Sequence, residues 1–234
     1  MGTCEKLQLF ATAFVLICSG EALGDSFTLD DWALSTGIID TRNHFSSSFT
    51  PQPSPYISAQ HVMVAPSEAH SYFDFSWTPD TASFLIAASH VAVDGNGGTR
   101  SLSSGNIYIT PSVDLLLSAQ GHYDWDLPAG AMAIQWGFVA WDFQSHEVYF
   151  SQGDMHTTFL HGPASGTFTI NGQGVLPPNR QIVLQYNMIL DTFGSTGLLA
   201  TGAGEINFSL VPEPHMLALF TVGACLLRKK SFRR

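Results

Sequence analysis

An all-β fold, an antiparallel two-sheet β-sandwich or jelly roll, is predicted by three features of this 234-residue chain. Apolar and polar residues alternate with a period of two in many short windows, which is typical of strands with one buried face. Turns rich in glycine, proline and asparagine separate these windows. Between the two ends of the chain, no window keeps a 3.6-residue period over three turns. We therefore expect one domain of about ten to twelve strands without helices.

The first half of this body is expected to contain strands and one long loop. In Asp25–Thr41, Phe27 and Leu29 alternate with polar residues, which predicts a first strand. Arg42–Pro55 is rich in serine and proline, which is typical of a loop. The next expected strands are Tyr56–Val64, His70–Trp77 and Ser83–Val93. The last of these is apolar on both faces, as expected for a central strand.

The second half shows the most regular alternation. The expected strands are Asn106–Thr110, Val113–Gln120, Met132–Phe143, His146–Phe150, His156–Leu160, Gly166–Asn171, Gln181–Asp191 and Gly204–Val211. The last two have unbroken inward-facing rows, which are Ile182, Leu184, Tyr186, Met188 and Leu190, and then Ile206, Phe208 and Leu210. We expect the final strand to end at Val211.

The N-terminal end has the pattern of a signal peptide over residues 1–24. Leu7–Ile17 is an apolar core preceded by Lys6, and the small residues Ala22 and Gly24 suit the −3 and −1 positions of a cleavage site. This segment predicts export through the Sec translocon, with a mature body that begins at Asp25.

The C-terminal end, residues 211–234, consists of three parts in a fixed order. Pro212, Glu213 and Pro214 come first, and an apolar run from Met216 to Leu227 follows. The chain ends in a basic tail of Arg228, Lys229, Lys230, Arg233 and Arg234. Such a tail favours retention of that end in the cytoplasm. As a helix, the apolar run would reach about 18 Å, which is short of the roughly 30 Å hydrocarbon core of a bilayer.

This three-part tail closely resembles the PEP-CTERM sorting signal of Gram-negative bacteria. The resemblance implies that an exosortase recognises Pro212, Glu213 and Pro214 and removes the tail. The protein would be held transiently in the inner membrane and then pass to the cell surface or an extracellular polymer matrix. The resemblance covers about a tenth of the chain, and residues 25–210 form the expected sandwich domain. An unprocessed membrane anchor is the alternative interpretation of the same tail.

Composition narrows the function of the body. All three cysteines, Cys4, Cys18 and Cys225, lie in the terminal segments, so the body has neither a cysteine nucleophile nor a disulfide framework. Residues 25–211 contain no lysine, three arginines and sixteen acidic residues, a net charge of about −13. Such a charge repels phosphate backbones, so nucleic-acid binding is not expected.

Two short acidic segments are weak candidates for a calcium site. Asp94 and Asn96 lie in a glycine-rich run that resembles the start of a calcium loop, although a glycine-rich hairpin turn fits it better, since Gly98 and Gly105 stand where ligands are required. Asp124 and Asp126 flank Trp125 and share one face if the chain is extended there. They are consistent with calcium binding, with a sugar ring stacked on Trp125, with half of a glycosidase carboxylate pair, or with a solvated turn.

Other motifs give no catalytic assignment. His122, His146, His156 and His161 fall within 40 residues, but they lack a His-x-His spacing and are expected on the surface or in turns. The chain contains no nucleophile elbow, no phosphate-binding glycine loop and no His-Glu-x-x-His motif. We therefore expect a non-enzymatic surface protein, structural or adhesive in an exopolysaccharide or biofilm. A secreted carbohydrate-active enzyme or carbohydrate-binding module on the same scaffold is the alternative.

Overall fold

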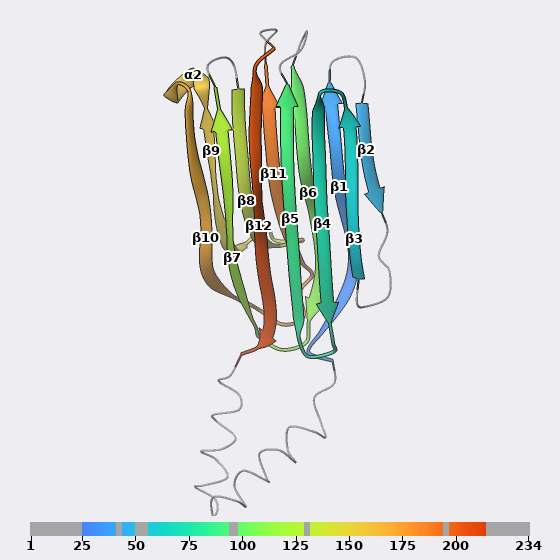
Figure 1. The fold of residues 1–234 in the computed structure, drawn as a ribbon. Helices are drawn as coiled ribbons and strands as arrows, with labels where there is room; N and C mark the ends of the chain where they lie inside the picture. The colour runs from blue at the N-terminus through green and yellow to red at the C-terminus, as the bar shows by residue number, and fades with distance from the viewer. Residues whose placement is uncertain are drawn as a thin grey trace, which may run out of the picture.

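A computed structural model of the protein describes residues 25–40, 44–49, 56–93, 98–128, 132–193 and 197–213. These residues form two six-stranded antiparallel sheets that face each other (Figure 1). Sheet A has the order β2-β1-β6-β11-β8-β9, and sheet B has the order β10-β7-β12-β5-β4-β3. The two-sheet, all-β prediction is confirmed.

The strand bounds are as follows. Sheet A contains β1 (Phe27–Asp40), β2 (His44–Phe49), β6 (Thr99–Pro111), β8 (Met132–Asp142), β9 (Val148–Thr157) and β11 (Ile182–Thr192). Sheet B contains β3 (Tyr56–Val64), β4 (Ser67–Trp77), β5 (Ala82–Val93), β7 (Leu115–Leu127), β10 (Ala164–Leu176) and β12 (Leu199–Pro212). A short helix, α2 (Thr158–His161), connects β9 to β10.

The last eight strands have the order of a jelly roll. β5, β12, β7 and β10 are neighbours in sheet B, and β6, β11, β8 and β9 are neighbours in sheet A. The chain therefore crosses repeatedly between the two sheets, as the double Greek key of a jelly roll requires. The first four strands extend this core at one side, with β1 and β2 beside β6 and with β4 and β3 beside β5.

Aromatic side chains fill the space between the sheets. Phe208 on β12 stacks on Phe84 of β5 and on Phe138 of β8, with ring centroids 4.7 Å apart in both pairs. Trp32 on β1 packs edge-on against Phe75 of β4 at 5.1 Å. All four of the rings Phe75, Phe84, Phe138 and Phe208 are at most 2% exposed. Burial of this kind stabilises a body that has no cysteine.

The inward-facing rows expected on the two late strands are confirmed. On β11, the side chains of Ile182, Leu184, Tyr186, Met188 and Leu190 are fully buried. On β12, Ile206, Phe208 and Leu210 are buried, while Glu205, Asn207 and Ser209 alternate with them on the outer face. The period of two predicted the inward row of both strands, although Val183, which alternates with the inward row of β11, is buried as well.

The expected loop at Arg42–Pro55 is wrong in part, because β2 forms at its centre. Residues 44–49 pair with β1 in antiparallel register, from Ile39 opposite His44 to Leu34 opposite Phe49. β2 lies at the edge of sheet A, where backbone pairing to one neighbour is enough to define a strand. A serine-rich sequence lacks the apolar alternation by which a strand is usually recognised.

The region around β9 also differs from the prediction. His146, expected to begin a strand, lies in the β8–β9 turn with a φ of 61°, and β9 begins only at Val148. The carboxylate of Asp142 organises this turn, since its Oδ1 accepts the N–H groups of Gln144 and Ser145 at 2.8 and 2.7 Å. The expected strand His156–Leu160 ends at Thr157 and continues as α2, which Gly162 closes with a φ of 76° and an N–H bond to the Thr158 carbonyl.

Both ends of the described body meet at the turn between β6 and β7. Ser112 donates its N–H to the Ser26 carbonyl at 2.9 Å and its hydroxyl to the Asp25 carbonyl. The N–H of Glu213 donates to the Asp114 carbonyl at 2.9 Å. β12 pairs through Pro212, opposite Leu115, and so continues one residue beyond the expected end at Val211. The chain therefore enters and leaves the sandwich at the same end (Figure 1).

Candidate functional site

The outer face of sheet B carries a shallow groove of about 580 Å³. Its floor consists of small side chains, because Ala87 and Ser89 on β5 and Ala203 on β12 point outward there. Larger side chains from neighbouring strands form its two walls. These are His61, His70 and Tyr72 on the β3–β4 side, and His122, Asp124 and Glu205 on the β7–β12 side.

The β7–β12 wall of the groove is acidic. Strand register places Ala203 opposite Asp124 and Glu205 opposite His122, so both carboxylates border the same stretch of floor. The hydroxyl of Thr167 on β10 donates to Asp124 Oδ1 at 2.5 Å, which fixes one oxygen of that carboxylate. Carboxylates on a wall of this kind accept hydrogen bonds from hydroxyl groups or attract cations.

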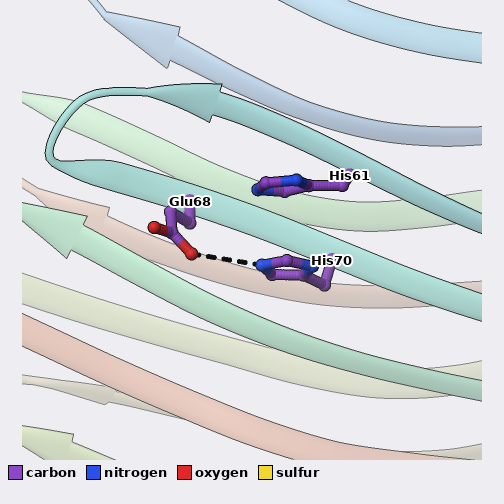
Figure 2. A group of neighbouring side chains, drawn as sticks. All are labelled: His61, Glu68 and His70. Atoms are coloured by element: carbon purple, nitrogen blue, oxygen red, sulfur yellow. Dashed lines mark hydrogen bonds and ion pairs between the residues drawn. The ribbon is translucent and has the colours of Figure 1, made fainter.

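The β3–β4 wall contains a cluster of His61, Glu68 and His70 (Figure 2). The two imidazole rings stack with centroids 3.9 Å apart and an interplanar angle of 7°. Glu68 Oε2 lies 3.1 Å from His70 Nε2. Sequence reasoning missed this cluster. Its members are separated by up to nine positions in the chain, and only the hairpin register brings them together.

The structure confirms one prediction about Tyr123–Asp126 and corrects another. Asp124 and Asp126 share the exposed outer face of β7, as expected for two residues in an extended segment. The segment is the C-terminal part of the strand β7 rather than a turn. Trp125 therefore points into the core, where it is 9% exposed and packs against Phe168 at 5.3 Å and His156 at 4.6 Å. Stacking of a sugar ring on Trp125 is ruled out by this burial.

The other candidate site residues lie partly inside and partly outside the ranges that the structure describes. Asp94, Asn96, Pro214 and the basic tail lie outside the described residues, whereas Pro212 and Glu213 lie at the end of the described sheet. His122, His146 and His161 are exposed, in agreement with the prediction, and His156 is half-buried. Among the described residues, His61, Glu68 and His70 form the only cluster of three or more metal-ligating side chains.

A buried polar pair lies beneath the outer face of sheet B. Tyr123 on β7 reaches across β12 at Gly202, and its hydroxyl lies 2.6 Å from Nδ1 of His90 on β5. Burial lowers the pKa of His90 to about 3, with a smaller contribution from the charge of His70. Burial also raises the pKa of Tyr123 well above its ordinary value. The pair is therefore neutral at physiological pH, and its hydrogen bond joins the two strands that flank β12.

Comparisons with known proteins give weak structural similarities and no sequence match. No protein-family model and no curated protein sequence matches the chain. A solved structure of infectious bursal disease virus, Gt strain, has a TM-score of 0.32 at 10% identity over 82% of this chain and 58% of that chain. A family 11 carbohydrate-binding module from Clostridium thermocellum, in complex with a β-1,3-1,4-mixed-linked tetrasaccharide, has a TM-score of 0.21 at 9% identity over 76% and 96%. The chain thus spans less than two thirds of the viral protein.

Within the described part of the chain, no helix has the length and apolar character needed to cross a membrane. The apolar run Met216–Leu227 lies outside that part.

Proposed function

We propose that this protein is an exported surface or matrix protein whose C-terminal tail is a sorting signal for an exosortase. The observation that carries the proposal is the order of the tail, in which Pro-Glu-Pro, an apolar run and a basic cluster follow one another at the C-terminus. The strand β12 ends within the Pro-Glu-Pro motif, at Pro212. The motif therefore begins where the folded body ends, which is where a protease could remove the tail without disrupting the sheets.

The position of the two ends supports this proposal. Asp25 and Glu213 are both bonded to the β6–β7 turn, so the described body begins and ends at the same end of the sandwich. A body joined to a membrane through either segment would direct the opposite end of the sandwich away from the bilayer. Translocation by the Sec machinery and transient retention by the tail are compatible with one orientation of the body.

Replacement of the motif tests the sorting proposal. We expect Pro212→Ala, Glu213→Ala and Pro214→Ala in one chain to abolish removal of the tail and to retain the protein in the membrane fraction. Mass spectrometry of the wild-type surface form should find a C-terminus near Pro212–Pro214, and deletion of an exosortase gene should remove that species. A matched control is Glu147→Ala with Pro163→Ala, since both residues are exposed and lie far from the tail in sequence. Mature surface protein that retains Arg234 would contradict the proposal.

The groove on sheet B favours a second function for the body, which is contact with a polysaccharide of the surrounding matrix. The floor is free of large side chains, one wall carries two carboxylates, and the other carries Tyr72, which is 37% exposed. Hydroxyl-rich polymers are bound by such combinations of acceptors and aromatic faces. The groove is open and shallow, which suits a long chain better than a small enclosed ligand.

Binding to immobilised glycans tests this second function. In a glycan array with the Asp25–Glu213 body, we expect Tyr72→Ala to weaken binding about fivefold, because an aromatic contact contributes about 1 kcal/mol. Phe143→Ala is the matched control, since Phe143 is 48% exposed and lies in the turn that follows β8 of sheet A. Equal binding by both variants would contradict a role for the groove. Hydrolysis of a glycan that Asp124→Asn or Asp126→Asn abolishes would establish the enzymatic alternative instead.

A further inference from the structure

The β3–β4 hairpin places three metal-ligating side chains on one face. His61 and His70 are directly opposite in the antiparallel register, and the hairpin turns at Ala65–Pro66. Glu68 precedes His70 by two positions, so its side chain points to the same outer face. Directly opposed residues in an antiparallel pair have Cβ atoms about 4.5–5.5 Å apart, which is close enough for two imidazoles to share an ion.

The distances between the ligand atoms suit a small ion. One nitrogen from each histidine and one oxygen of Glu68 all lie within 4.8 Å of one another. Ligand atoms of a tetrahedral ion with bonds of about 2.0–2.2 Å are about 3.4 Å apart. Because the lone pairs of two parallel imidazoles do not converge, coordination of one ion also requires the stacked rings to rotate apart. His70 and Glu68 are free to rotate, because their side chains are 45% and 40% exposed, and His61 lies on the edge strand β3.

From this geometry we infer that His61, Glu68 and His70 form a binding site for a divalent transition-metal ion of the Zn²⁺ class. Two imidazole nitrogens and one carboxylate oxygen are a donor set that Zn²⁺, Cu²⁺ and Ni²⁺ accept. Ca²⁺ and Mg²⁺ prefer oxygen donors alone, so the site selects against them. This inference goes beyond the sorting proposal and does not depend on it.

The surroundings of the cluster favour a cation. The body carries a net charge of about −13, and Asp124 and Glu205 lie on the opposite wall of the groove. His61 and His70 themselves line that groove. Three protein ligands leave at least one position of a four-coordinate ion for water or another donor. An ion bound here would therefore offer a coordination position at the edge of the groove.

A titration of the full-length protein with ZnCl₂ tests the site. The protein is purified in detergent without a polyhistidine tag and is stripped of metal with EDTA. Cys4, Cys18 and Cys225 are replaced by serine throughout, because thiolates also bind zinc. Isothermal titration calorimetry should find one Zn²⁺ per chain. We expect His61→Gln and His70→Gln each to weaken binding by about 100-fold or more, and Glu68→Gln by about tenfold.

Two further measurements keep the test decisive. The double variant His146→Gln with His161→Gln removes two exposed histidines elsewhere, one more than each site variant, and should bind Zn²⁺ like the parent. Co²⁺ should give the intense visible absorption of a four-coordinate site with the parent protein and lose it with His61→Gln. Unchanged circular dichroism spectra establish that the variants are folded. If no Zn²⁺ binds at metal concentrations on the order of 100 micromolar, the inference is overturned. Equal affinity of the parent and the His61→Gln variant would also overturn it and would leave a stacked histidine pair.

Discussion

Gly204→Ala is expected to lower the free energy of unfolding by roughly 3 kcal/mol or more. Gly204 lies on β12 opposite Tyr123 of β7. A Cβ atom at this position would lie 2.5 Å from Tyr123 Cα and closer still to the His122 carbonyl oxygen. Both contacts are with backbone, so no side-chain rotation can relieve them, and β12 would have to move away from β7. Urea denaturation of the Asp25–Glu213 body measures the change.

Gly137→Ala is the matched control for this prediction. Gly137 lies inside β8, and a Cβ atom there would lie 3.3 Å from the Gln152 carbonyl oxygen and 3.4 Å from Gly153 Cα. These distances require only a small adjustment, so we expect a change below about 1 kcal/mol. Equal destabilisation by both variants would show that loss of glycine in a strand, rather than the close approach of β12 to β7, is the cause.

The fold class was accessible from the sequence because the strand period is short and local. On β11 and β12, every residue that the alternation assigned to the inner face is buried in the structure. The same rule, applied consistently, excludes the proposed sugar contact at Trp125. If Asp124 and Asp126 both face solvent in an extended segment, the residue between them must face the core. Its burial on β7 follows from the alternation that the two carboxylates already indicated.

The jelly-roll order and the histidine cluster depend on pairings that a local pattern does not contain. β12 lies between β5 and β7, which are more than 70 positions earlier in the chain. The cluster depends on a single hairpin, so one signal was available. In an antiparallel hairpin that turns at Ala65–Pro66, paired residue numbers have a constant sum, and His61 and His70 satisfy it. A search for histidines placed symmetrically about each turn would have found this pair.

The sorting proposal rests on the sequence alone, whereas the binding proposals rest on the folded structure. The proposed sorting signal is linear, so its residues can be identified without knowledge of the fold. The groove and the His61–Glu68–His70 cluster exist only when sheet B is assembled, because their members come from several strands. If the proposal holds, substitutions from Pro214 onward should change the location of the protein and leave the stability of the body intact, because the paired strand β12 ends at Pro212. Substitutions on the outer face of sheet B should alter ligand or metal binding and leave the location of the protein unchanged.

The second large effect is expected in acid, where the buried His90 should make the body lose stability. Its pKa is about 3 in the folded protein and about 6.5 as an ordinary histidine. Above about pH 6.5 it is neutral in both states and contributes no pH dependence. As the pH falls from about 6.5 to 3, the unfolded chain binds a proton that the folded chain does not, so unfolding becomes easier. The loss is at most about 1.4 kcal/mol per pH unit, or about 3 kcal/mol at pH 4.5.

His90→Gln separates this effect from the other acid-sensitive groups. The variant should be less stable than the parent at pH 7 by about 1–3 kcal/mol, because Tyr123 loses its partner, but its stability should fall much less between pH 6.5 and 4.5.

The Asp142 carboxylate contributes to stability in a different pH range. Hydrogen bonds from Ser145 and Gln144, together with Arg180, lower its pKa from 3.8 to about 2, so its contribution is lost only as the pH falls from 3.8 toward 2. His122→Gln, an exposed histidine on the outer face of the same sheet, should retain the parent's slope. Urea denaturation at half-unit pH steps measures all three proteins, and an unchanged slope in His90→Gln would assign the acid sensitivity to groups other than the buried histidine.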